Sequence, residues 1–332
     1  MRVSQNLNQA LHDLLDNDPS LYLLGEDIAD PYGGAFKITK GLTTRFPGRV
    51  FTTPLSEGGV VGIAAGLALA GQSAIVEIMF GDFVTLAFDQ IVNFASKSVS
   101  MYGRRVSMPV VVRCPVGGGR GYGPTHSQSL QKHFIGVPGL SLYEMSPFHD
   151  NGPLLREILM RGEPAMFFED KSLYGRRMFT DGVVDKMFSY DLTIPGVARV
   201  FAEQADAADC VLIAPGGIVQ KAMKAARSLL LEEEISSVVI VPSCLYPFPL
   251  EPLLPILRQA EVICIAEEST AGGTWGTEVA QQIHQELWDA MQRPVVLVNS
   301  DSSVIPASEH LEKQVLIQHT TIREAIVEAL RA

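Results

Sequence analysis

Apolar residues in the first half of the chain gather in short runs, and helical patterns separate these runs. The runs predict buried strands at 21–24, 74–79, 109–113, 140–145 and 165–169. The helical patterns lie near 59–70, 84–102 and 150–161, after a first helix with Leu7, Leu11, Leu14 and Leu15 on one face. Buried strands that alternate with helices are typical of a parallel sheet covered on both faces.

A second series of the same kind starts after residue 197. It predicts strands at 210–215, 236–242, 261–268 and 294–299, and helices near 218–232, 250–259, 274–288 and 320–331. Between the two series, residues 181–197 show no sustained period and include Pro195-Gly196, which favours a linker. The predicted fold class is therefore α/β, with two doubly wound domains at 1–180 and 198–332, of which the second is smaller.

Composition narrows the class of protein. Acidic residues outnumber basic ones 37 to 26, giving a net charge of -11, which disfavours nucleic acids and anionic membranes as partners. The four cysteines are scattered and lie mostly in apolar runs, as expected of buried thiols in a reducing compartment. Arg2 is followed by polar residues rather than by the apolar core of a signal peptide, and no run of about 18 apolar residues occurs. We therefore expect a soluble, cytoplasmic protein.

Three stretches that suggest a nucleotide or metal site lack a required residue. GLALAGQS (66–73) has the glycine spacing of a phosphate-binding loop, but Gln72 replaces the lysine. GGGRGYG (117–123) does not match the dinucleotide pattern GxGxxG, so we expect a loop with unusual backbone angles or a close approach to a ligand or neighbour. His126 and His133 could share a helical face, but no third ligand accompanies them, so we assign no metal-binding residue.

Candidate functional residues lie at strand ends and loops of the first domain, where open α/β sheets bind ligands. The stretches are TPLSEGG (53–59), FGDF (80–83) and GYGPTHSQS (121–129). Glu57 is either a functional carboxyl or an acid favoured by the start of a helix, and composition alone favours a core residue at Phe83. His126 follows a glycine-rich loop, with Ser127 placed to cap a following helix, which makes it an acid/base candidate.

Long motifs in a fixed order run through nearly the whole chain. They include GEDIADPYGGAFKITKGL, RVFTTPLSEGGVVGIAAGLALAG, EIMFGDFVTLAFDQIVNFASK, PVVVRCPVGGGRGYGPTHSQS, IAEESTAGGTWGTEVAQQI and SVIPASEHLEKQVL. With these motifs the sequence resembles the β subunits of heterotetrameric 2-oxo acid dehydrogenase E1 components of the pyruvate, branched-chain and acetoin type. That family belongs to the transketolase-like superfamily and uses thiamine diphosphate.

The resemblance implies roles for four residues. Glu57 would hydrogen-bond the aminopyrimidine ring of thiamine diphosphate, which requires a carboxyl that keeps a proton near neutral pH in an apolar site. Phe83 would pack on that ring, and Leu55 would also contact the cofactor. His126 would assist proton and acyl transfer as a general acid or base. Residues 1–180 would form the pyrimidine-binding domain, and the C-terminal domain would carry no catalytic residue.

The resemblance also implies a partner chain. The superfamily holds Mg²⁺ and the diphosphate with a GDG motif, whereas this chain has Gly81-Asp82-Phe83 and no GDG. Mg²⁺ and the diphosphate would therefore bind to an α subunit, and an α2β2 heterotetramer would share the cofactor between chains. The complex would decarboxylate a small 2-oxo acid and transfer the acyl group to lipoamide on an E2 acyltransferase.

Two departures from the family pattern leave alternatives open. Thr125 stands where many members have tyrosine, which leaves the acyl-group preference undecided. The stretch VPSCLYPFPLEPL (241–253) replaces the family's DLRTLxPLD and makes docking to E2 less certain. The alternatives are a subunit of a split transketolase-type or acyloin-forming enzyme, and a non-catalytic assembly subunit.

Overall fold

The computed structural model describes residues 1–202 and 204–331, and the chain divides into two compact units. The first unit comprises Met1–Val116 and Phe134–Met178. The second comprises Gly117–His133 and the chain from Phe179 onward. The segment that carries His126 therefore belongs to the second unit, although in sequence it interrupts the first.

The elements follow one another in the alternating order expected from the sequence. Up to Met178 they are α1 (Val3–Asn17), β1 (Leu21–Glu26), α2 (Leu42–Arg45), β2 (Val50–Thr53), α3 (Glu57–Leu69), β3 (Ser73–Glu77), η1 (Gly81–Ala87), η2 (Gln90–Ala95), α4 (Ser96–Ser98), β4 (Val110–Val116), η3 (Gln131–Phe134), β5 (Ser141–Glu144), α5 (Asn151–Met160) and β6 (Ala165–Asp170). From Phe179 they are β7 (Ser189–Ile194), β8 (Val197–Phe201), β9 (Cys210–Ile213), η4 (Gly216–Ile218), α6 (Val219–Glu233), β10 (Ser237–Pro242), β11 (Cys244–Tyr246), η5 (Glu251–Leu253), α7 (Leu254–Leu257), β12 (Val262–Thr270), α8 (Trp275–Leu287), β13 (Val296–Ser300), α9 (Glu309–Val315) and α10 (His319–Arg331).

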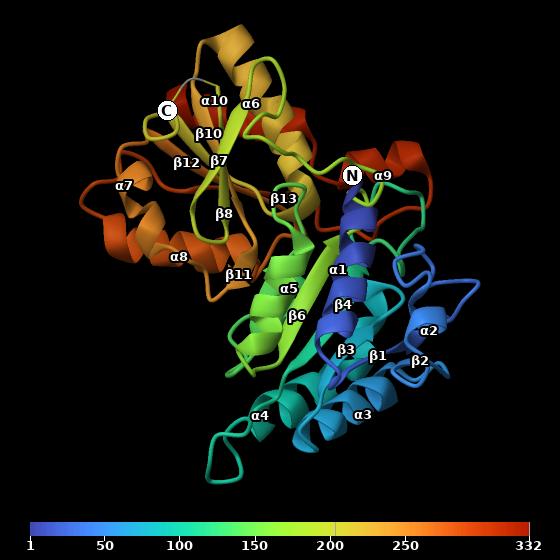
Figure 1. Ribbon diagram of the computed structural model, residues 1–332. Coiled ribbons are helices and arrows are strands. Elements are labelled where there is room, and N and C mark those ends of the chain that lie inside the picture. The colour runs from blue at the N-terminus through green and yellow to red at the C-terminus, as the bar shows by residue number, and fades with distance from the viewer. Residues whose placement is uncertain (203, 332) are drawn as a thin grey trace. The chain divides into compact units, whose positions relative to one another are not determined.

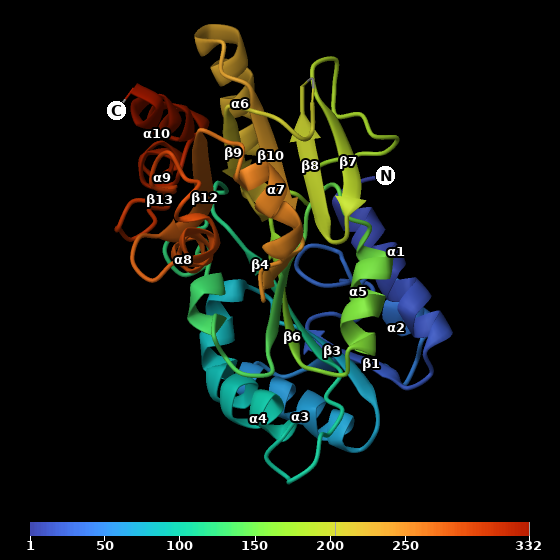
Figure 2. The same ribbon diagram turned by 90° about the vertical axis from the view of Figure 1, so that its left-hand side faces the viewer.

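The first unit is built on a parallel sheet in which the strands run in the order β5-β6-β4-β3-β1-β2. Helices α1 and α5 lie side by side along one face, and α3 packs on the other (Figure 1, Figure 2). Every residue of β4 and β6 is buried, because strands covered on both faces have no side that meets water. The expected parallel α/β architecture is therefore confirmed for this unit.

A charged cluster lies inside this sheet. Arg113 on β4 donates to both carboxylate oxygens of Glu169, at 2.6 and 3.0 Å, and to Glu77 at 2.8 Å. Tyr174 donates its hydroxyl to Glu169 at 2.7 Å. Glu77 lies directly opposite Arg113 in the register of β3 and β4. All four side chains are buried, so each charge depends on these partners for its solvation.

The second unit contains a mixed sheet in the order β13-β12-β9-β10-β8-β7. The strands β13, β12, β9 and β10 are parallel to one another. At the other edge, β8 pairs antiparallel with β10, and β7 pairs antiparallel with β8. Helices α6 and α10 pack against each other, and α8 packs against β12. Strands β9, β10, β12 and β13 match the expected apolar runs, and the two-domain α/β fold is confirmed.

The range expected to be a linker, 181–197, is partly structured. Residues 189–194 form β7, which pairs with β8 across a turn at Pro195-Gly196. Gly196 has a φ of +70°, a value that favours glycine, so the Pro-Gly pair marks a hairpin rather than a linker. The alternation of β7 is weak because only Tyr190 is buried, which explains why the sequence pattern showed no period.

The helix expected at 84–102 is also divided. The chain there forms the 3-10 helix η1, the π-helix η2 and the short helix α4. Within the described part of the chain, no helix is both long and apolar enough to cross a membrane.

Candidate active site

Glu57 is the first residue of helix α3 and is 9% exposed. The helix start lies close to η1, because a Cβ on Gly58 would stand 3.0 Å from the Leu86 carbonyl oxygen. The next glycine, Gly59, is equally tight, since a Cβ there would meet the Ser56 hydroxyl at 2.6 Å. The two glycines after Glu57 therefore allow the helix to begin against its neighbours, with the carboxyl at the buried end.

A second carboxyl, which sequence reasoning missed, lies at the same place. Glu26 ends strand β1 and is buried. Burial raises the pKa of Glu26 above its ordinary value, and the nearby Glu57 carboxylate raises it further, while the Ser56 backbone N–H opposes the rise by donating to Glu26. The raised pKa of Glu26 favours a retained proton beside Glu57. The sequence offers little indication of a functional carboxyl at Glu26, because the residue appears there only as a polar residue after an apolar run.

Phe83 lies on η1 and is half-buried, and its ring contacts Phe80 edge to face at a centroid distance of 6.4 Å. Its backbone N–H donates to the Phe80 carbonyl at 3.0 Å. Gly81 is required between them, because a Cβ there would lie 2.5 Å from the Val116 side chain. Leu55, just before α3, is 81% exposed. An apolar side chain and a partly open aromatic ring thus accompany the carboxyl pair in the first unit.

His126 lies in the loop after β4, within the second unit, and is half-buried. Its Nδ1 is 3.0 Å from the Thr125 hydroxyl, and its backbone N–H donates to the Gly123 carbonyl at 3.5 Å. Ser127 does not cap a helix, because the next helical turn is the short η3 at Gln131–Phe134. The cap expectation was therefore wrong, and a turn closed on Gly123 holds the histidine instead.

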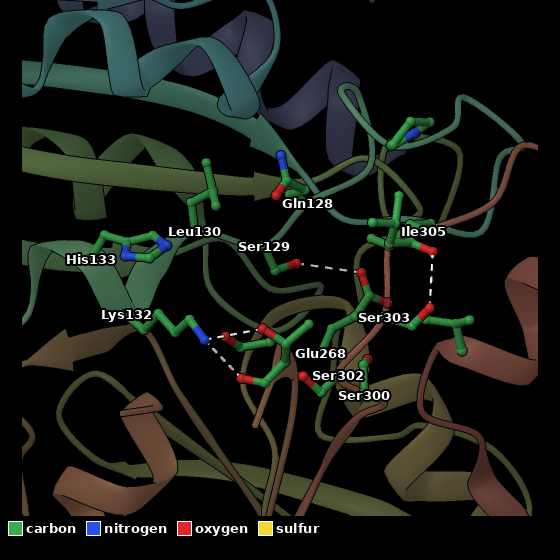
Figure 3. Close-up of a pocket in the computed structure, with 15 residues that line it drawn as sticks. Gln128, Ser129, Leu130, Lys132, His133, Glu268, Ser300, Ser302, Ser303 and Ile305 are labelled. Atoms are coloured by element: carbon green, nitrogen blue, oxygen red, sulfur yellow. Dashed lines mark hydrogen bonds between the residues drawn. The ribbon is translucent and has the colours of Figure 1, made fainter. Parts of the chain in front are cut away.

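A cavity of about 490 Å³ lies in the second unit at the carboxyl ends of β12 and β13, as Figure 3 shows. Lys132 donates to the carbonyl and hydroxyl oxygens of Thr270 at 2.9 and 3.1 Å, and Ser129 donates to Glu268 at 3.4 Å. Neither Leu55, Glu57, Phe83 nor His126 is among the residues that line it. The chemistry predicted from the sequence therefore lies outside this cavity. Among the described residues, no group of three His, Cys, Asp or Glu side chains could hold a metal ion.

Comparison with known protein families matches both halves of the chain. Residues 1–177 match the family described as "Transketolase, pyrimidine binding domain", and residues 201–322 match "Transketolase, C-terminal domain". The chain is 32% identical over 326 residues to the pyruvate dehydrogenase E1 component subunit beta of Leifsonia xyli subsp. xyli, covering 98% of this chain and 93% of the relative. This chain belongs to the transketolase-like E1 β-subunit family.

Other matches agree with this assignment. The β subunit of the acetoin:2,6-dichlorophenolindophenol oxidoreductase of Cupriavidus necator is 30% identical over 321 residues, covering 94% of this chain and 92% of the relative. Among solved structures, a split-gene transketolase described as an inactive β4 tetramer superposes with a TM-score of 0.74 at 20% identity, covering 100% of this chain and 99% of that one. At that identity the superposition shows a shared fold alone.

The residues present fit the thiamine cofactor that the transketolase-like family implies. A carboxyl that hydrogen-bonds an aminopyrimidine ring needs a buried site, and Glu57 is buried beside Glu26, whose pKa is raised by burial and by Glu57. The half-buried Phe83 ring and the exposed Leu55 side chain supply apolar surface in the same unit. Glu26 is the part of this fit that the sequence did not indicate.

Proposed function

We propose that the chain is the β subunit of a 2-oxo acid dehydrogenase E1 that decarboxylates a 2-oxo acid and transfers the acyl group to lipoamide. The observation that carries the proposal is the pairing of the buried Glu57 and Glu26 carboxyls at the start of α3. The names of the E1 β relatives support the same reaction. The domain limits expected from the sequence, 1–180 and 198–332, are part of this proposal.

Thiamine diphosphate, when bound, supplies the electron sink that decarboxylation requires. The Glu57 carboxyl would hydrogen-bond the aminopyrimidine ring, and Glu26, whose pKa is raised by its burial and by Glu57, would keep a proton close by. Phe83 and Leu55 would hold the ring in place by apolar contact. His126, with Thr125 orienting its imidazole through Nδ1, would move a proton at the reacting carbon or at the acyl acceptor.

We also propose that an α subunit completes the site in an α2β2 tetramer and holds Mg²⁺. Helix α3 is almost entirely apolar, yet Ile63 on it is 57% exposed, and Leu55 and Leu86 next to it are also exposed. A helix that is apolar on every side is usually covered, so this surface favours a permanent partner. Glu57 and Phe83 lie on α3 and η1, the same two elements that expose this surface.

The test compares Glu57→Gln with the wild type after co-expression with the α subunit encoded nearest to this chain. We expect turnover of the 2-oxo acid to fall about 100-fold or more, because general acid/base groups contribute roughly 10²- to 10⁴-fold, while the tetramer still assembles. Glu157→Gln is the matched control, since Glu157 is an exposed glutamate on α5 of the same unit. Calorimetric titration of thiamine diphosphate with Mg²⁺ is run on the lone chain and on the complex.

Binding by the complex alone, with loss of turnover in Glu57→Gln, supports the proposal. Tight binding by the lone chain contradicts the shared site. Unchanged turnover in Glu57→Gln contradicts the role of the carboxyl and favours a non-catalytic assembly subunit. If the wild-type complex passes the two-carbon unit to an aldehyde but not to lipoamide, the split transketolase-type or acyloin-forming reaction is the correct one.

A further inference from the structure

The glycine-rich loop before His126 has a backbone shape that binds anions. Gly117, Gly119, Gly121 and Gly123 all have φ values between +68° and +88°, and they alternate with other residues. Alternation of left-handed with ordinary backbone makes successive N–H groups point into one concavity, which attracts a negative charge. The four glycines are needed for this shape, because other residues rarely adopt such φ values.

The anion in this concavity is a side chain of the same unit. The two carboxylate oxygens of Glu312, on α9, accept hydrogen bonds from the N–H groups of Gly119 at 2.8 Å and Gly121 at 3.0 Å. Glu268, at the end of β12, accepts from the Gly118 N–H at 2.7 Å. Glu312 is 1% exposed, so its carboxylate depends on these donors for its hydrogen bonds. Two carboxylates from the C-terminal half of the chain therefore hold three backbone groups of the loop.

Close packing holds the loop in the same position. A Cβ on Gly118 would lie 2.5 Å from a methyl carbon of Leu316, the residue that follows α9. A Cβ on Gly121 would lie 3.2 Å from the Ala307 carbonyl oxygen. At Gly118 and Gly121 the loop therefore lies directly against the segment that carries Glu312, without space for a side chain at these two positions.

We propose that Glu312 is a positioning residue that fixes the place of His126 through the glycine loop. The inference rests on the role assigned to His126 under the proposed function. Only four residues lie between Gly121 and His126, and the bond from the His126 N–H to the Gly123 carbonyl closes the turn between them. Without the Glu312 carboxylate, the N–H groups of Gly119 and Gly121 would lose their acceptor, so the loop and the imidazole would shift together.

The test measures steady-state kinetics of the α2β2 complex with Glu312→Ala and Glu312→Gln. Misplacement of a reacting group by about 1 Å can lower the rate about 100-fold, so we expect kcat to fall about 10- to 100-fold in Glu312→Ala. Glu312→Gln keeps one carbonyl acceptor and should lose less. KM for the 2-oxo acid and the affinity for thiamine diphosphate should change less than about twofold, because the loop effect acts through His126. Glu309→Gln, an exposed glutamate one turn earlier on α9, is the control.

A double-mutant cycle separates positioning from general structural damage. If Glu312 acts through His126, the complex with both His126→Ala and Glu312→Ala is no slower than His126→Ala alone. If Glu312→Ala slows the His126→Ala complex as much as it slows the wild type, the inference is wrong. Should Glu312→Ala fail to fold, the same cycle is made with Glu312→Gln, and equal slowing in both backgrounds again overturns the inference.

Hydrogen exchange of the loop separates the two proposals. Exchange of the amides at 117–123 should accelerate in Glu312→Gln and stay unchanged in Glu309→Gln, whatever His126 does. If His126→Ala leaves turnover unchanged, the role of His126 in the proposed function fails. Faster loop exchange in Glu312→Gln would still show that Glu312 holds the loop in place. If loop exchange does not change in Glu312→Gln, Glu312 does not hold the loop in place and the inference is refuted. The proposed role of His126 in proton transfer is not affected by that result.

Discussion

A buried histidine outside the candidate site makes the stability of the first unit depend on pH. His149 lies between β5 and α5 and is 8% exposed, with its Nδ1 2.7 Å from the Ser146 hydroxyl. Its Nε2 is buried without a hydrogen-bond partner among the described residues. Burial lowers the pKa of His149 from 6.5 to about 4, because the charged imidazolium would lose its hydration there.

The size of the effect follows from the difference between the two states. Below pH 6.5 the unfolded chain takes up a proton at His149, whereas the folded chain does so only near pH 4. The contribution of the neutral side chain is therefore fully present above pH 6.5, and it is lost as the pH falls from 6.5 to 4. At 1.36 kcal/mol per pKa unit, the free energy of unfolding should drop by about 3 kcal/mol over this range.

The assay is urea denaturation of the wild type and of His149→Asn at intervals between pH 7 and pH 4. Asparagine keeps a polar group near the Ser146 hydroxyl but does not titrate, so the difference between the two curves isolates the histidine. We expect that difference to shrink by about 3 kcal/mol toward pH 4. Ser146→Ala is the control, since it removes the hydrogen bond but keeps the burial, and it should retain the pH dependence.

A direct titration decides the cause. The ring protons of His149, identified by their absence in His149→Asn, should titrate near pH 4 in the folded protein. A midpoint near 6.5 would refute the reasoning, and so would a difference curve that is flat with pH. Loss of the pH dependence in Ser146→Ala would assign the effect to the hydrogen bond rather than to desolvation.

Two further predictions concern charges in the first unit. Arg113→Met leaves the carboxylates around it buried without a cation and should lower the free energy of unfolding in urea at pH 7 by about 3–5 kcal/mol. Arg105→Met, which removes an exposed ion pair, should change it by less than about 1 kcal/mol, and equal losses would contradict this account. At Asp30, burial alone would raise the pKa, but donors led by the Gly41 N–H lower it to about 2. The ionised Asp30 should add about 1–2 kcal/mol to the free energy of unfolding above pH 3.8, and this contribution should disappear toward pH 2. Urea denaturation of the wild type and of Asp30→Asn measures it, and a difference that stays constant with pH would contradict the prediction.

The sequence predicted the parallel strands well because a strand covered on both faces must be apolar throughout. Strands β4, β6 and β9 are such runs, and each lies within a few residues of its predicted position. Edge elements have one face in water and carry a weaker pattern. Strand β7 and helix α9 were missed for this reason, since only one residue in each is buried.

Polar residues whose role depends on distant partners could not be recognised in the same way. Glu26 and Arg113 both lie in or beside apolar strand runs. The neighbouring sequence does not reveal that Glu26 lies near Glu57 in the candidate site, or that Arg113 bonds Glu77 and Glu169 inside the sheet. Their roles follow from the order of the strands, which brings residues far apart in sequence to one place. The position of Glu57 at the start of a helix was predictable because an apolar helical run follows it.

The glycine loop shows how a motif can be found before its purpose is known. Its spacing excluded a dinucleotide site, and either unusual backbone angles or a close neighbour was the remaining explanation. Both are present, since the alternating positive φ values create the anion concavity and Leu316 leaves no space for a side chain at Gly118. The ligand of the concavity is the carboxylate of Glu312, 191 residues beyond Gly121. A loop that resembles a phosphate-binding motif can therefore bind the protein's own carboxylate, and its glycines then serve the placement of a neighbouring side chain rather than a nucleotide.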